Sequence, residues 1–190
     1  MYDQTWLAWE AAGRPVPPPH IVKQWTVKHY GEGFSLRTFI ETGTYLGEMV
    51  QAVKASFKTV LSIELEPLLY ERAKTLFAQD DHVTIHYGDS GVILADLLAS
   101  IKHPCLFWLD GHWTGGPVHA ARGQQDTPIL QELGHILGHR VKNHVILIDD
   151  ARLFNGTNDY PSLEQLRETV SRHDSALGFH VENDIIRIHR

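Results

Sequence analysis

The chain has 190 residues, of which 43% are apolar and 21% charged, and its formal net charge is −6. This length and composition predict one globular domain with a core of ordinary size. The negative charge gives no long-range attraction to nucleic acid or to an anionic membrane, so we expect neither as a partner. A single cysteine, Cys105, excludes an internal disulfide framework. The sequence shows no apolar run long enough to span a membrane and no signal-like start, which favours a cytoplasmic location.

Residues 1–36 are predicted to form an N-terminal arm. Trp6 and Trp9 indicate a short helical or docking segment, and the prolines of residues 14–19 favour an extended connection because proline fixes φ and removes a donor. Residues 20–30 then have the pattern of a helix, whose apolar face would contain Ile21, Val22, Trp25 and Val27. We expect this arm to lie on the main domain near the mouth of the site. An exposed pair of tryptophans would suggest a homodimer.

From residue 37 onward, strand-like and helix-like segments alternate. The predicted strands are 37–41, 59–64, 82–87, 105–109, 145–148, 178–182 and 185–189. Helices are expected over about residues 47–57 and from about residues 67, 90, 126 and 162. The helix at 90 would be capped by Ser90, and the helix at 162 would open with a capping box of Ser162 and Gln165. This alternation predicts an α/β fold over residues 37–190. It would be a single Rossmann-like, doubly wound, mostly parallel sheet of seven strands that ends in an antiparallel hairpin.

The stretch 38–48 connects the first predicted strand to the first helix of this domain. Glu41 ends the strand, Gly43 and Gly47 lie in the turn, and Tyr45 stands between the two glycines. Glycines allow a sharp turn and a close approach to a ligand, and the following helix offers free N–H groups at its start. The pattern predicts the entry of a nucleotide-type cofactor site.

Every strand from the first to the fifth ends in a carboxylate, and in an open α/β sheet ligands bind beyond these ends. We therefore expect a shared cleft lined by Glu41, Glu64, Asp89, Asp110, Asp149 and Asp150. Glu64 lies about 20 residues after Gly43, where an acid can bind ribose hydroxyls, although it could also be a solvated loop acid. Asp89 and Ser90 could hold the edge of a base or could cap the next helix.

Three of these acids end neighbouring strands and would repel one another. Asp110, Asp149 and Asp150 therefore predict a bound cation, for which oxygen ligands favour Mg²⁺, with Ca²⁺ and Mn²⁺ as alternatives. A competing interpretation is that Asp150 turns outward as a cap or pairs with Arg152.

The predicted loop over residues 111–125 is long and rich in glycine and histidine. His112 and His119 could each serve as a general base or a metal ligand, and His112 could equally pack or stack on a cofactor. Trp113 could line the cofactor or acceptor site or simply pack. Arg122 could bind an anionic group or pair with Asp126.

These motifs together resemble class I S-adenosylmethionine-dependent methyltransferases. The sequence ETGTYLG at 41–47 is similar to their first motif, and Tyr45 in place of its middle glycine resembles the catechol and caffeoyl-coenzyme A O-methyltransferase branch. The sequences LDGHW at 109–113 and IDD at 148–150 are similar to that branch's two metal-binding strand ends. Macrolide-sugar and aminocoumarin-sugar O-methyltransferases share this layout.

The resemblance implies a role for each matching residue. Gly43, Tyr45 and Gly47 would shape the loop under the methionine part of the cofactor, with Glu41 at its base. Glu64 would bind the ribose, Asp89 and Ser90 would lie by the adenine, and Asp110, Asp149 and Asp150 would bind Mg²⁺. The catechol enzymes have a lysine base shortly after their first metal aspartate, and no lysine follows here. His112 and Asp110 are therefore the candidate catalytic residues, although Gly111 shifts the register of His112.

The function predicted from this resemblance is divalent-metal-assisted O-methylation of a small molecule or sugar hydroxyl, with methyl transfer to nitrogen left open. Two alternatives belong to other classes. A metal-dependent phosphoesterase would use the Asp/His cluster but would leave the turn at 41–47 without a task. A non-catalytic cofactor-binding or assembly protein would use the N-terminal arm for docking.

Overall fold

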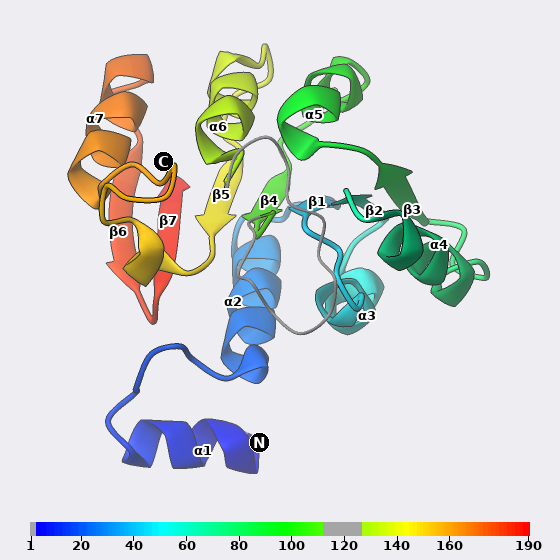
Figure 1. Cartoon of the computed structure of the whole chain (residues 1–190), viewed down its shortest axis with the longest axis horizontal. Coiled ribbons are helices and arrows are strands. Elements are labelled where there is room, and N and C mark those ends of the chain that lie inside the picture. Colours follow the sequence, from blue (N-terminus) through cyan, green and yellow to red (C-terminus); the bar gives the residue numbers. More distant parts are fainter. Residues whose placement is uncertain (1–2, 112–126) are drawn as a thin grey trace.

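The structure is a computed structural model that describes residues 3–111 and 127–190. It contains a seven-stranded sheet with the order β3-β2-β1-β4-β5-β7-β6 (Figure 1). The strands are β1 (Thr38–Thr42), β2 (Thr59–Glu64), β3 (Val83–Tyr87), β4 (Leu106–Leu109), β5 (Val145–Ile148), β6 (Gly178–Glu182) and β7 (Ile185–His189). The first five strands pair in parallel, whereas β7 pairs antiparallel with both β5 and β6. The predicted fold class is confirmed.

Helices cover both faces of this sheet (Figure 1). One face carries α2 (His20–Gly33), α3 (Glu48–Val53) and α4 (Pro67–Leu76), and the other carries α5 (Ser90–Ala99), α6 (Ile129–Gly138) and α7 (Leu163–His173). Two short 3₁₀ helices, Lys54–Ser56 and Ala151–Leu153, follow α3 and β5. Because the central strands contribute side chains to both layers, β4 is buried along its whole length, as a continuous apolar run predicts. Within the described residues, no helix has the length and apolar character needed to cross a membrane.

Of the two helix caps predicted from the sequence, one is confirmed and one is wrong. Ser162 and Gln165 form the expected capping box at the start of α7. At the start of α5 the capping residue is Asp89, whose carboxylate accepts from the N–H of Gly91, so the prediction of Ser90 as the cap is wrong. Asp and Ser cap helices equally well, and the cap lies one residue earlier than we predicted, so that Ser90 is the first residue of α5.

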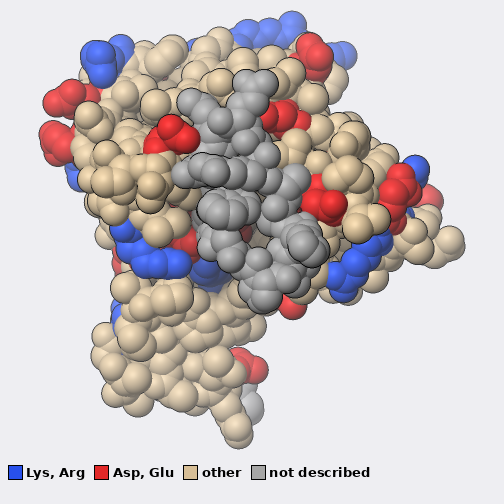
Figure 2. Space-filling view, in the orientation of Figure 1, with Lys and Arg blue, Asp and Glu red and all other residues tan. Residues whose placement is uncertain are grey.

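The N-terminal arm packs against the rest of the chain through α2. The short helix α1 (Gln4–Ala11) lies at the edge of the molecule, and its surface in Figure 2 carries few charged side chains. Trp6 and Trp9 are buried against Val22 of α2, at 8% and 4% exposure. The prediction that these two tryptophans are exposed, on which the suggestion of a homodimer rested, is therefore wrong. Trp25 is 40% exposed and does not belong to the inner face of α2, where Lys23 is buried instead.

The order of the strands fixes where a ligand can bind. The connections run outward in opposite directions from β1 and β4, which are neighbours in the sheet. The carboxyl ends of these two strands therefore border the crevice that open α/β sheets use for ligands.

Candidate functional site

The turn after β1 can form only with glycine at its first position. Gly43 has φ +84, and a Cβ on this residue would lie 2.4 Å from the backbone oxygen of Asp110. Tyr45 and Gly47 also have positive φ values, of 49 and 79. The turn therefore lies directly against the end of β4, with no side chain between the two backbones.

Glu64 at the end of β2 holds this turn from the side. Its Oε2 accepts from the backbone N–H of Tyr45 at 2.7 Å, and its Oε1 accepts from the N–H of Glu66 at 2.9 Å. Burial raises the pKa of Glu64, and these backbone hydrogen bonds oppose the rise. The backbone N–H of Leu65 adds a third hydrogen bond, and a carboxylate has about four acceptor positions, so Glu64 can still accept a further hydrogen bond. Glu64 therefore holds the turn in place and can also accept a hydrogen bond from a ligand. Because its side chain is buried, the alternative interpretation of a solvated loop acid is wrong.

Glu41 lies beneath the turn. Its side chain is 1% exposed and accepts from the hydroxyl of Ser62, which also contacts the hydroxyl of Thr44 at 2.6 Å. Burial raises the pKa of Glu41 well above its usual range, and the nearby charges of Asp110 and Glu64 add to this rise. The structure therefore places Glu41 in the support of the turn.

The start of α5 completes the wall of the crevice. Asp89 caps this helix, so the capping alternative is confirmed for Asp89. Ser90 is 7% exposed, and its Oγ lies 3.3 Å from where a Cβ on Gly111 would stand. Thr42 Oγ1 lies against the same position at 3.1 Å and has no hydrogen-bond partner within the described residues. Sequence reasoning did not select Thr42, since a threonine at the end of a strand carries no distinctive pattern.

A lysine from the N-terminal arm joins the acids at the end of β5. The ammonium of Lys23, which is 8% exposed, donates to Asp149 Oδ2 and lies 3.4 Å from Asp150 Oδ1. Burial lowers the pKa of Lys23, but the charges of Asp149, Asp150 and Asp110 outweigh burial, and the net shift is upward. Burial and the charge of Asp110 raise the pKa of Asp149, and Lys23 opposes them. The arm therefore reaches two of the acids that the sequence predicts for the site, in agreement with the expectation that it lies on the main domain.

Asp150 is held by a second cation. Arg152 Nη1 donates to Asp150 Oδ1 at 2.7 Å and also to Asp184 in the turn between β6 and β7. The alternative in which Asp150 pairs with Arg152 is therefore confirmed, although Asp150 is only 6% exposed and does not turn out to solvent.

The metal prediction rested on acids without a counter-charge, and this premise is wrong. Lys23 and Arg152 supply positive charge to Asp149 and Asp150. Across residues 3–111 and 127–190, no group of three or more His, Cys, Asp or Glu side chains is arranged to hold a metal ion. His112, Trp113, His119, Arg122 and Asp126 lie outside the described residues, so the catalytic prediction for His112 stays a prediction.

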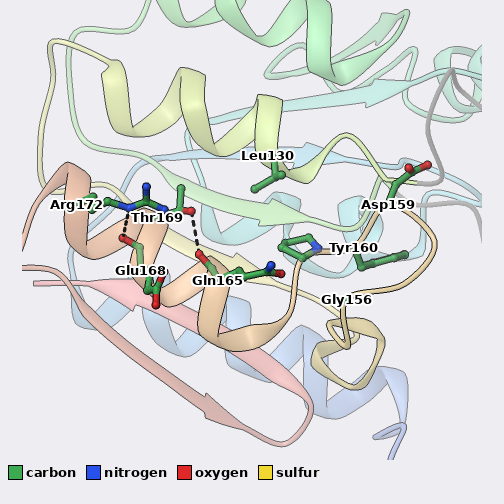
Figure 3. Close-up of a pocket in the computed structure, with 9 residues that line it drawn as sticks. Leu130, Gly156, Asp159, Tyr160, Gln165, Glu168, Thr169 and Arg172 are labelled. Atoms are coloured by element: carbon green, nitrogen blue, oxygen red, sulfur yellow. Dashed lines mark hydrogen bonds between the residues drawn. The ribbon is translucent and has the colours of Figure 1, made fainter.

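A hollow lies away from these strand ends. It has a volume of about 420 Å³ and is bordered by one side of α7, by Leu130 of α6 and by residues 156–161 (Figure 3). Its charged and polar lining includes Asp159 together with Gln165, Glu168, Thr169 and Arg172 of α7. None of the residues predicted for the site from the sequence lines it.

Comparison with known proteins places the fold. No protein-family model and no curated protein matches the chain. Among solved structures, an O-methyltransferase from Bacillus cereus in complex with S-adenosylhomocysteine has a TM-score of 0.60 at 14% identity, over 100% of this chain and 92% of that one. The O-methyltransferase TomG from Streptomyces achromogenes, in complex with S-adenosylmethionine, has a TM-score of 0.58 at 16% identity, over 99% and 89% of the two chains. The Podospora anserina methyltransferase PaMTH1, bound to S-adenosylhomocysteine, has a TM-score of 0.58 at 11% identity, over 100% and 88%. This chain therefore has the Rossmann-like fold of class I S-adenosylmethionine-dependent methyltransferases.

Proposed function

We propose that this protein is an S-adenosylmethionine-dependent methyltransferase that methylates a hydroxyl group of a small molecule. The observation that carries the proposal is the turn after β1, which Glu64 holds through the N–H of Tyr45 and which Gly43 lets approach the end of β4. This turn lies at the point of the sheet where ligands bind in such folds.

The residues around the crevice fit this cofactor. In our proposal the carboxylate of Glu64 accepts the ribose hydroxyls, and the turn formed by Gly43, Tyr45 and Gly47 supports the methionine part. Asp89 and Ser90 lie by the adenine. The buried Thr42 hydroxyl, which lacks a partner within the described residues, offers a further polar contact at the floor of the crevice.

The chemistry divides between the cofactor and the chain. S-adenosylmethionine, when bound, supplies an electrophilic methyl group. The chain has to hold an acceptor oxygen in line with that carbon and to remove its proton. Asp110, at the end of β4 beside the turn, is our candidate for orienting the acceptor, and His112 is our candidate for the base.

Assistance by Mg²⁺ does not fit the described residues. Of the oxygens that would bind the ion, Oδ2 of Asp149 and Oδ1 of Asp150 are engaged by Lys23 and Arg152, and we derive no step through a metal. The same pairing removes the basis of the metal-dependent phosphoesterase alternative. A methyltransferase is therefore the single function that we propose.

Isothermal titration calorimetry with S-adenosylhomocysteine tests this function. We expect binding to the full chain, and Glu64→Ala should weaken it by about 10- to 150-fold, the range that hydrogen bonds to a charged group contribute. Glu71→Ala, at an exposed position of α4, is the matched control and should bind like the wild type. The absence of any binding at millimolar ligand would overturn the proposal, and it would favour the non-catalytic alternative.

A further inference from the structure

We propose that Lys23 takes the place of a divalent metal ion at the acceptor side of the site, so that the protein binds no metal there. Lys23 lies 126 positions before Asp149 in the chain, yet its ammonium donates to Asp149 and lies 3.4 Å from Asp150. The part of the proposal that concerns the acceptor rests on the proposed methyltransferase function, whereas the part that concerns the metal does not.

The position of Lys23 is fixed by the packing of α2. Val22 and Val27, on either side of it along the helix, are fully buried, and Gly31 contacts the ring of Phe57. Thr26, one turn after Val22, donates its hydroxyl to the carbonyl of Val22. A lysine on such a helix cannot leave its partners by a simple side-chain rotation, because the helix face around it is covered. The pair therefore differs from an exposed ion pair, whose side chains are free to separate.

The two oxygens of Asp149 are both engaged. Oδ2 accepts from Lys23, and Oδ1 accepts from the backbone N–H of Asp150 at 2.8 Å. Asp150 Oδ1 accepts from Arg152 at 2.7 Å. A divalent ion at these oxygens would have to displace the ammonium and then stand beside two positive side chains, which electrostatic repulsion opposes.

An ammonium can also perform part of what a metal would do for the acceptor. It carries three N–H donors, of which Asp149 and Asp150 engage at most two. The third donor can bind the acceptor oxygen and stabilise negative charge that develops there as its proton leaves. Because the ammonium is fixed by α2, this donor is oriented before the acceptor binds.

Calorimetry of the full chain with MgCl₂ and MnCl₂ tests the proposal. The wild type should show no binding at millimolar metal. Lys23→Met should gain binding of Mn²⁺ or Mg²⁺ by at least about tenfold, because its acids regain an uncompensated charge. Lys23→Arg keeps the charge and should bind no metal. Lys28→Met, on the same helix and without a described ion pair, is the control and should behave like the wild type.

Two results would overturn the proposal: submillimolar binding of Mg²⁺ by the wild type, or a folded Lys23→Met variant that gains no metal binding. If Lys23→Met does not fold, Lys23→Gln, which keeps N–H donors without the charge, should show the same gain, and its absence there would count equally against the proposal. The outcome is independent of the proposed function. Metal binding by the wild type would leave S-adenosylhomocysteine binding intact, and failure to bind S-adenosylhomocysteine would leave the metal result unchanged.

Discussion

Replacing Gly43 with alanine tests whether the turn after β1 depends on contact between two backbones. Gly43 has φ +84, and an added Cβ would stand 2.4 Å from the carbonyl oxygen and 2.8 Å from the carbonyl carbon of Asp110. Both atoms belong to the backbone, and Asp110 is tied to β1 by its own N–H, which donates to the carbonyl of Thr42. Neither the backbone at Gly43 nor the backbone at Asp110 can move without breaking a hydrogen bond between strands.

Two costs add up at this position. An alanine with left-handed φ costs about 1–2 kcal/mol, and forcing an extra methyl group into a packed site costs about 1–3 kcal/mol. We expect Gly43→Ala to lower the free energy of unfolding by about 2–5 kcal/mol. Gly13 supplies a matched control, because it has the same φ of +84 and a Cβ there would meet nothing within 4 Å. Gly13→Ala should therefore show the conformational cost alone, about 1–2 kcal/mol.

Urea unfolding followed by circular dichroism gives the free energy of each variant, and S-adenosylhomocysteine titration gives the consequence for the site. We expect Gly43→Ala to lose ligand affinity as well as stability, since the turn has to withdraw from Asp110. Gly13→Ala should keep wild-type affinity. Equal losses of stability in the two variants would refute the reasoning, because the contact with Asp110 would then cost nothing.

Two further predictions concern buried titratable groups. Burial raises the pKa of Glu41 well above 4.5, so the folded state keeps a proton that the unfolded chain releases. This contribution to stability is complete below pH 4.5 and is lost as pH rises toward the raised pKa, by about 1.4 kcal/mol per pH unit. In urea unfolding between pH 5 and 8, the free energy of unfolding of Glu41→Gln should rise relative to that of the wild type as pH rises. The exposed control Glu71→Gln should show no such trend. A difference between Glu41→Gln and the wild type that stays constant with pH would contradict the raised pKa of Glu41. Burial also raises the pKa of the Cys105 thiol, just before β4, to about 12, so a thiol-specific reagent should modify Cys105 only after unfolding. Rapid modification of the native protein would contradict this burial.

The strands could be predicted closely because their signals are local. Apolar and β-branched runs bounded by polar residues gave β2, β5, β6 and β7 with the bounds that the structure has. The first helix of the domain was predicted too long, since α3 ends at Val53 and a 3₁₀ turn follows it. Helical periodicity does not distinguish the two kinds of turn at a helix end.

Glu64 was predictable for a different reason. The distance along the chain from the turn to the end of the second strand is set by one βα unit, and parallel pairing brings Glu64 beside the turn. The side of the strand on which Glu41 lies could not be predicted in this way. Its carboxylate lies under the turn with Ser62, because the last residues of β1 are buried on both faces, and spacing alone does not reveal on which side of a strand a side chain lies when both sides are apolar.

The pairing of Lys23 with the acids could have been predicted from two features of the sequence, the apolar face of α2 and the acids that end β4 and β5. Lys23 lies one position after Val22 and four before Val27, so helical spacing puts it on the face that these valines bury, and Trp25 lies on the other side. A lysine on a buried face requires a carboxylate partner, because an unpaired ammonium is costly to remove from water. The acids that end β4 and β5 required a cation for the same reason. Charge balance between α2 and the end of β5 therefore predicts the pair of Lys23 and Asp149. It favours the lysine ammonium over a metal ion from solution as the partner of these acids.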